Sequence, residues 1–329
     1  MSVENYKKAL FDSIMNLLWR QWVALGVAGY SAKDEERYVL DPESLIVFSA
    51  AFCRQDARLF DLFASWLLKY GRLINTTRLK ALLGKAEYCD RRSLSYLAAL
   101  NVEAGDKRWS RFAVNEGFVE DEGRVLFVAE NGDEYNYCRS QDELALRYGW
   151  YRPTFVVQNK LRRELSAGHS TLLLRLRSLF GVSARAEVLV LLMQGAANIQ
   201  QLSEQSGFVR SAVKEVLDEL LMGNMASTVK VSGGRVSYVL KNAEGLMSMM
   251  GVNKVIFPDW KNIYGAFGKI WKLVSNPRLK GLSSATFKGE LRHLFYAELQ
   301  PAFLHCGVSN LEKLTEATLD DLPCIIAEM

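Results

Sequence analysis

Apolar residues recur at three- and four-residue steps over most of the chain, and this spacing predicts a mainly α-helical protein. One such helix is expected over residues 2–26, and others over residues 41–100. Asp41-Pro42-Glu43 begins one of them with a capping carboxylate, a proline at the first helical position and an acid in the first turn. The run that follows, SLIVFSAAFC, is apolar on nearly all sides, so we expect this helix to be buried.

The pattern changes between Glu103 and Arg147, where the runs FAVNEGFV, GRVLFVA and EYNYC are typical of strands. Residues 101–150 are also acidic. Such a face can repel phosphate, guide a partner or simply be solvated, and we take solvation as the default. Residues 160–185 are basic instead, and the pattern from Val156 to Phe180 favours a connecting helix.

The most specific pattern covers residues 183–241. An apolar helix, SARAEVLVLLMQG, precedes a short polar helix, NIQQLSEQ, the turn Ser206-Gly207 and an amphipathic helix, FVRSAVKEVLDELLMGN. Two strand-like runs follow, MASTVKV and RVSYVL, joined by a glycine-rich turn at residues 232–234. This order resembles the winged helix-turn-helix superfamily, as found in bacterial-type transcriptional regulators. The resemblance implies a fold and suggests binding to double-stranded DNA, but it names no target.

The amphipathic helix after the turn would be the recognition helix, whose first turns reach base edges in the major groove. A helix over 209–221 turns its valines and leucines inward and projects Arg210, Ser211 and Lys214 outward. Arg210 can pair with guanine, Ser211 with phosphate or base, and Lys214 with phosphate. The further candidates for DNA contact precede this helix or flank the hairpin tip: Gln200, Gln201, Lys230, Arg235, Arg175, Arg177 and Arg185.

The charge of residues 183–241 is nearly balanced, with six Lys and Arg against five Asp and Glu. Because neutralised phosphates supply most non-specific affinity, this module alone should bind DNA weakly. The basic segments 160–185 and 254–292 would strengthen binding if they lay on the same side as the recognition helix. An alternative function is that of a helical adaptor or antitoxin-like protein that binds another protein, with the winged helix as a scaffold.

Gly71 and Gly84 each end a predicted helix. The number of residues between them is nearly the same as the number between Gly195 and Gly207, which also lie beside predicted helices. Residues 56–128 are therefore a candidate for a degenerate second winged helix. The alternative is that any two capped helical hairpins look alike at the level of sequence.

A basic amphipathic helix is expected over residues 260–274. One face gathers apolar and aromatic residues, and the lysines fall on the opposite side. We expect the aromatic face to pack into the protein's own core. A dimer interface and a membrane surface are the alternatives.

Composition narrows the function without deciding it. A net charge of +4 and a pI near 8.7 permit nucleic-acid binding but do not argue for it. No two of the five cysteines lie at metal-clip spacing and the three histidines form no metal-binding pair, so no metal site, cofactor or disulfide framework is expected. Phosphate-binding loops, dinucleotide fingerprints and nucleophile elbows are also missing from the sequence, so we expect no enzymatic activity.

These patterns predict a mainly α-helical chain in four segments. They are an N-terminal helical domain (1–110), a mixed β-like segment with a basic connecting helix (111–179), the winged helix with its small hairpin (180–242) and a C-terminal helical domain (243–329). The expected protein is a cytoplasmic, sequence-specific transcriptional regulator that acts as a homodimer, with no membrane-spanning segment.

Overall fold

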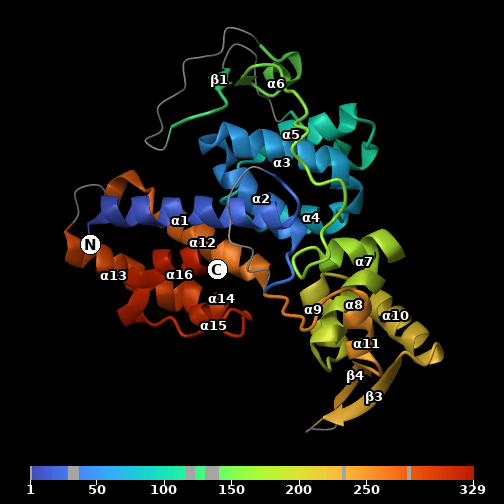
Figure 1. The fold of residues 1–329 in the computed structure, drawn as a ribbon. Helices are drawn as coiled ribbons and strands as arrows, with labels where there is room; N and C mark the ends of the chain where they lie inside the picture. Colours follow the sequence, from blue (N-terminus) through green and yellow to red (C-terminus); the bar gives the residue numbers. More distant parts are fainter. Residues whose placement is uncertain (1, 29–36, 116–122, 130–140, 232–234, 280–282) are drawn as a thin grey trace.

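The computed structural model describes residues 2–28, 37–115, 123–129, 141–231, 235–279 and 283–329. Within these ranges the protein is mainly helical and has two small two-stranded sheets, which confirms the predicted class (Figure 1). Two hydrophobic cores organise the described residues, a larger one and a smaller one.

The larger core combines helices from both ends of the chain. Its residues come from α1 (Val3–Ala24), α2 (Pro42–Phe52), α3 (Ala57–Tyr70), α4 (Thr76–Leu83), α5 (Arg91–Glu103), α6 (Glu143–Arg147), α12 (Trp260–Val274), α13 (Ser284–Leu294), α14 (Gln300–Phe303), α15 (Ser309–Glu312) and α16 (Leu322–Glu328). The segments predicted as separate N-terminal and C-terminal domains thus share one core.

Helix α1 lies against α16, so helices from the first and last parts of the sequence pack together (Figure 1). The hydroxyl of Tyr6 donates a hydrogen bond to the carbonyl of Leu319 at 3.2 Å. The Arg20 guanidinium donates to the carbonyl of Ile326, also at 3.2 Å. Both bonds satisfy carbonyl groups near the C-terminal helix with side chains of α1.

The aromatic face of α12 packs into this larger core, as predicted. Tyr264 stacks on Phe48 with ring centroids 4.6 Å apart, and its hydroxyl donates to Gln21 Oε1 at 2.6 Å. Trp260 is buried and donates from Nε1 to the carbonyl of Val39 at 2.7 Å. Because its own chain covers this face, the face is open neither to a dimer partner nor to a membrane.

The smaller core gathers α7 (Leu172–Phe180), α8 (Ala184–Gln194), α9 (Ile199–Ser206), α10 (Arg210–Met222), strand β4 (Arg235–Leu240) and α11 (Ala243–Met249). Strand β3 (Ala226–Val231) pairs with β4 in an antiparallel hairpin in which Lys230 is opposite Val236. The order of three helices and a hairpin is the one the sequence predicted. Its core also takes in α7, α11 and Val255, beyond the predicted boundaries at 180 and 242.

The predicted helix from Val156 to Phe180 is wrong over its first part, because only α7 is helical. The earlier residues form no helix, and some of their backbone groups bond to other parts of the chain. The Ala28 N–H donates to the Lys160 carbonyl and the Arg162 N–H to the Gly26 carbonyl, both at 2.8 Å. Backbone groups of Gly26 and Ala28, just after α1, thus supply hydrogen bonds that a helix would have formed within itself.

The acidic segment contains less strand than predicted among the described residues. Strand β1 (Arg124–Val125) pairs in parallel with β2 (Trp150–Tyr151). The described part of FAVNEGFV, residues 112–115, forms no strand. The run EYNYC lies outside the described residues, as does the rest of FAVNEGFV.

The similar spacing of the two glycine pairs does not reflect a repeated fold. Gly71 and Gly84 have helical φ values of −55° and −59°, whereas Gly195 and Gly207 have positive φ values of 147° and 77°. In the described part of 56–128, β1 pairs in parallel and no antiparallel hairpin is present. The second winged helix suggested for this segment is therefore not supported.

Five charged side chains join the two cores. Arg78 of α4 is held by both Asp41 carboxylate oxygens at 2.5 Å and by Glu43 Oε2 at 2.9 Å. Arg177 of α7 donates to both Glu43 oxygens, at 2.6 and 3.0 Å, and to Glu187 Oε1 of α8 at 2.6 Å. Buried charges of this kind are stable only when they are paired, so the network fixes α7 and α8 against α2 and α4.

Candidate nucleic-acid interface

A groove of about 530 Å³ lies where α9, α10 and β4 meet. Four of the predicted contact residues line it, one from α9 and three from the first turns of α10: Gln200, Arg210, Ser211 and Lys214. Predictions made separately for two helices thus fall on one surface. The side chains of Asn198 and Tyr238 complete much of the remaining wall.

Helix α10 has the amphipathic division that its sequence predicted. Val213 and Leu217 are fully buried, whereas Arg210, Ser211 and Lys214 are exposed. Val209 was expected to face the core with the other apolar residues. It lies instead at the N-cap of α10, where 67% of its surface is exposed.

The first turn of α10 has no side-chain cap, because valine carries no hydrogen-bond acceptor. Its N–H groups therefore remain available at the positive end of the helix, beside Arg210 and Ser211. Such a helix start can bind an anion such as a phosphate.

Helix α9 differs, because a reciprocal capping box closes its start. The Gln201 N–H donates to Asn198 Oδ1, and the Asn198 N–H donates to Gln201 Oε1, both at 3.0 Å. The Gln201 side chain therefore has a structural role that the prediction of a phosphate contact did not include. Gln200 is exposed toward the groove and donates from Nε2 to Glu204 Oε1 at 2.9 Å.

The turn between α9 and α10 depends on Gly207, whose φ of 77° is left-handed. Ser203 Oγ donates to the Phe208 carbonyl at 2.6 Å and secures the turn from the inside. A Cβ atom on Gly207 would lie 3.5 Å from the Arg78 side chain. The turn thus lies beside the side chain of Arg78, the arginine that pairs with Asp41 and Glu43 in the buried charge network.

Backbone hydrogen bonds join strand β4 to Ala197, which lies just before the N-cap of α9. The Ala197 N–H donates to the Tyr238 carbonyl at 3.1 Å, and the Tyr238 N–H donates back at 2.8 Å. Lys230 is exposed on β3, as predicted. The side chain of Arg235 and the hairpin tip at 232–234 lie outside the described residues, so their predicted contacts stay predictions.

Of the three basic candidates before α9, Arg177 is corrected by the structure. Only 1% of its surface is exposed, and Glu43 and Glu187 hold its guanidinium in the buried network, so it cannot reach a phosphate. Arg175 is half-buried and donates to the Met250 carbonyl at 2.5 Å. Both side chains hold parts of the fold together.

Arg185 lies at the start of α8 and pairs with Glu219 of α10 at 2.5 Å. Arg210 and Lys214 differ from it, because no acidic group among the described residues lies within ion-pair distance of either. Their charges are therefore available to an incoming anion. Glu215 and Asp218 are exposed on the same helix and limit its net positive charge.

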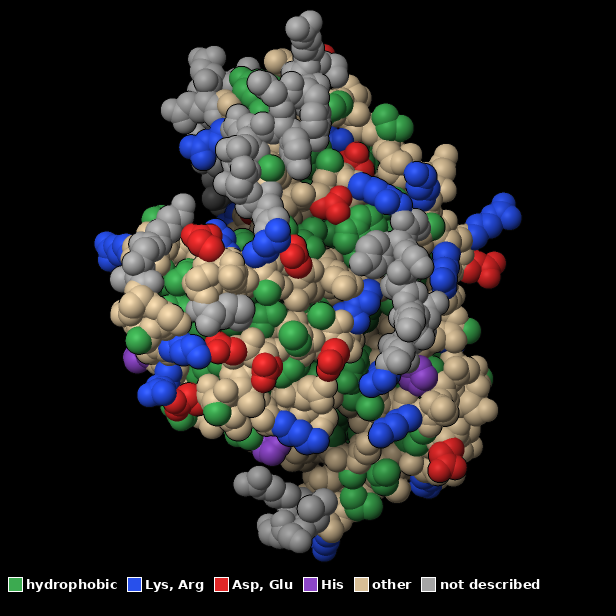
Figure 2. Space-filling model, turned by 60° about the vertical axis from the view of Figure 1, so that its left-hand side comes forward, with side chains coloured by type: hydrophobic (Ala, Val, Ile, Leu, Met, Phe, Trp, Pro, Cys, Tyr) green, Lys and Arg blue, Asp and Glu red, His purple; other side chains and the backbone are tan. Residues whose placement is uncertain are grey.

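The basic segment 254–292 does not extend this surface. Its helices α12 and α13 pack in the larger core at the left of Figure 1, whereas α10 lies at the right. Figure 2 turns the left-hand side forward and shows basic side chains mixed with acidic and apolar ones on that face. Helices α12 and α13 of this segment therefore do not lie on the same side of the protein as α10, which was the arrangement required for the segment to strengthen DNA binding.

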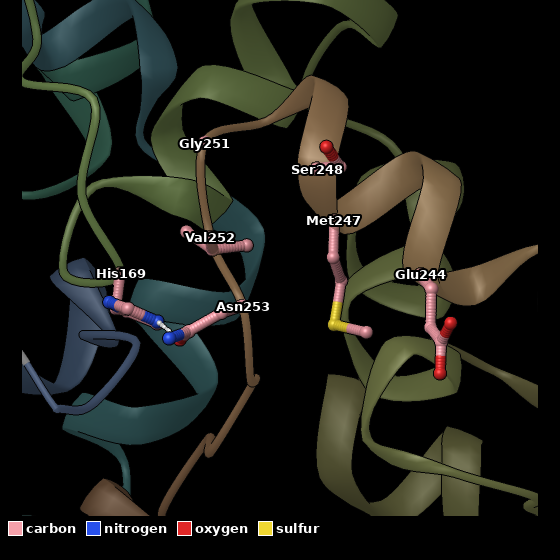
Figure 3. Close-up of a pocket in the computed structure, with 7 residues that line it drawn as sticks. All are labelled: His169, Glu244, Met247, Ser248, Gly251, Val252 and Asn253. Atoms are coloured by element: carbon pink, nitrogen blue, oxygen red, sulfur yellow. Dashed lines mark hydrogen bonds between the residues drawn. The ribbon is translucent and has the colours of Figure 1, made fainter.

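A second hollow, of about 610 Å³, lies between α11 and the loop before α7. In Figure 3 the side chains of His169 and Asn253 point toward one another, and His169 Nε2 lies 3.3 Å from Asn253 Oδ1. Glu244 and Met247 project from α11 at some distance from this pair. His169 thus has a hydrogen-bonding partner in Asn253.

The described residues contain no group of three or more histidine, cysteine, aspartate or glutamate side chains that could hold a metal ion. In the same ranges, no helix is both long enough and apolar enough to pass through a lipid bilayer.

Sequence reasoning missed Asn198 and Tyr238 as lining residues of the groove. The alternation in RVSYVL carried the signal, because it places residues 236, 238 and 240 on one face of β4. Asn198, the first residue of NIQQLSEQ, is recognisable from its sequence position as a helix cap but not as part of the groove wall. Comparison of the chain with protein-family models, with curated proteins and with solved structures found no match.

Proposed function

We propose that α8, α9, α10 and the β3–β4 hairpin form a winged helix that binds double-stranded DNA, and that the protein regulates transcription. One observation carries this proposal: Arg210, Ser211, Lys214 and Gln200 line a single groove at the exposed start of α10. The two cations have no described acidic partner, so their charges are free to meet phosphate.

In this proposal α10 enters the major groove with its first turn leading. Arg210 reads a guanine edge through paired hydrogen bonds, and Lys214 contacts a backbone phosphate. Ser211 and the uncapped N–H groups of α10 bind a neighbouring phosphate. Lys230 of the hairpin approaches the backbone or minor groove beside the site.

We further propose that the protein binds as a homodimer. Residues 183–241 carry six basic and five acidic side chains, so one copy offers little phosphate neutralisation. Two copies would place two α10 helices on half-sites one helical turn apart and double the number of contacts. The buried network gives each α10 a fixed direction relative to the larger core, which such spacing requires.

The test is fluorescence anisotropy with duplex DNA from the protein's own promoter region, at low and moderate salt. Replacing Arg210 and Lys214 together by Ala should weaken binding roughly tenfold or more, since a base contact and a phosphate contact are lost. The matched control replaces Lys107 and Arg111, which are exposed near α5, by Ala. It removes the same charge from another surface and should leave binding nearly unchanged. Equal losses in the two double variants would sink the proposal.

A further inference from the structure

A longer groove, of about 880 Å³, follows the outer face of α12. Its floor includes Lys261, Gly265, Lys269, Lys272 and Asn276, residues spaced so that they share one side of the helix. The connection between α4 and α5 forms one wall, and α14 with the segment before it forms the other. The lining runs from Lys261 to Asn276 along nearly all of α12, whose fifteen residues span about 22 Å.

The lining combines apolar surface with lysines. Leu82, Leu273 and Leu294 contribute partly buried apolar side chains from three different elements. Four exposed lysines stand around them: Lys85, Lys261, Lys269 and Lys272. An occupant of this groove would therefore need both an apolar stripe and negative charge.

Two of the lysines are already paired with acids in the walls. Lys269 meets Glu298 at 2.5 Å, and Lys272 meets Glu87 at 2.9 Å. Lys85 and Lys261 have no acidic partner within ion-pair distance among the described residues. The groove thus keeps a net positive charge with two free cations, on a surface that is otherwise partly apolar.

Gly265 leaves the middle of the floor open. A Cβ atom added there would meet no other atom within 4 Å, whereas one added at Gly268 would run into the Tyr88 ring. Glycine is a poor helix former in a helix interior, and no neighbour fills the space above this one. A ligand can therefore approach the backbone of α12 closely at this point.

We propose that this groove binds an acidic amphipathic helix from a partner protein. An α-helix about 15 residues long matches the groove floor in length, and its apolar stripe would cover the leucines. Acidic residues beside the stripe would pair with Lys85 and Lys261. The apolar lining favours such a helix over the phosphates of a nucleic acid, which carry no apolar surface for the leucines. The inference is independent of DNA binding by α10, because the groove belongs to the larger core.

The experiment selects binders for the full-length protein from a displayed library of helical peptides about 15 residues long. The enriched peptides should carry an apolar stripe at three- and four-residue spacing flanked by Asp and Glu. Their Kd should rise roughly tenfold or more in Gly265→Leu, whose side chain would fill the groove. Replacing Lys85 and Lys261 together by Glu should weaken the same peptides by a similar factor and favour basic ones.

Gly289→Leu is the matched control. Gly289 is also a glycine inside a helix, and an added Cβ there likewise meets nothing within 4 Å, but it lies on α13 outside the groove. This variant should bind the enriched peptides as the unmodified protein does, and circular dichroism should show both leucine variants folded. Enriched peptides without acidic character, or equal binding by the two leucine variants, would overturn the proposal. Displacement of the peptides by duplex DNA that still binds after replacement of Arg210 and Lys214 would also overturn it, in favour of a nucleic-acid groove.

Discussion

Arg177 and Glu43 lie 134 positions apart in the chain, yet the guanidinium of one donates to both carboxylate oxygens of the other. Both side chains are fully buried. Such a pair leaves a costly unpaired charge if either member is lost. It therefore joins α7 of the smaller core to α2 of the larger one through a contact that tolerates little displacement.

Replacing Glu43 by Gln should strongly destabilise the fold. The change leaves Arg177 and Arg78 without a shared carboxylate in a buried site, and breaking a buried pair costs about 3–5 kcal/mol. The free energy of unfolding can be measured by denaturant titration followed by circular dichroism.

Glu187→Gln is the comparison, and it should cost much less than Glu43→Gln. Burial raises the pKa of the Glu187 carboxyl and the charge of Glu43 adds to this, although Arg177 opposes both. Its Oε2 atom is buried, and no described group donates to it. A neutral amide keeps an oxygen for Arg177 and removes an unfavourable charge. A larger loss for Glu187→Gln than for Glu43→Gln would contradict this account.

The charge of Asp41 should make stability depend on acid. Burial acts to raise the pKa of Asp41, but Arg78 and Ser44 outweigh it and lower the pKa from 3.8 to about 2. Because the folded pKa is depressed, the stabilisation is present above pH 3.8 and is lost as the pH falls toward 2, by about 2 kcal/mol.

Asp41→Asn should flatten this part of the profile. Asparagine can still cap α2 by accepting from the Ser44 N–H, so the helix start is retained while the titrating charge is removed. Unfolding titrations at several pH values between 4 and 2 compare the two proteins. A variant whose stability falls as steeply as that of the unmodified protein would show that Asp41 is not responsible.

Gly207→Ala should destabilise the protein by about 1–2 kcal/mol, because an alanine at φ 77° is strained. Gly84→Ala is the matched control at the end of another short helix. Its φ of −59° suits any residue, and an added Cβ meets only ordinary contacts at 3.5 Å. Thermal unfolding midpoints should fall for the first variant and hold or rise for the second. Equal effects would show that the left-handed turn carries no special cost.

Lys214→Ala should reduce the salt dependence of DNA binding. If Lys214 neutralises one phosphate, the slope of log K against log salt concentration falls in magnitude by about 1. Lys107→Ala, on the larger core, should leave the slope unchanged. Anisotropy titrations at several salt concentrations give both slopes, and an unaltered slope for Lys214→Ala would remove it from the phosphate contacts.

Local signals in the sequence predicted the local structure well. Asp41 is predicted as a helix cap, and it accepts a hydrogen bond from the Ser44 N–H in the first turn of α2. Asp56, Asn75 and Asp259 cap α3, α4 and α12 in the same way. A cap acts within a few residues of itself, so its effect is visible in a short window of sequence. The same is true of the glycine turn and the hairpin that place Arg210 beside Gln200.

Contacts between distant residues decided what the sequence could not predict. The residues around Arg177 give no sign that its partner is Glu43, so the sequence predicts a surface residue where the structure has a buried one. The stretch that begins at Val156 is not helical, and Gly26 and Ala28 bond to its backbone instead. The lysine-lined groove was equally hidden, since one wall is the connection between α4 and α5 and the other is α14 with the segment before it.

The contact between Tyr6 and Leu319 also sets an order of events during protein synthesis. A ribosome releases α1 long before it has made α12 and α16, the helices against which α1 packs. Leu10, Ile14 and Leu18 of α1 are fully buried in the folded protein. Because α1 packs against α12 and α16, the larger core closes only after both of these later helices have been made.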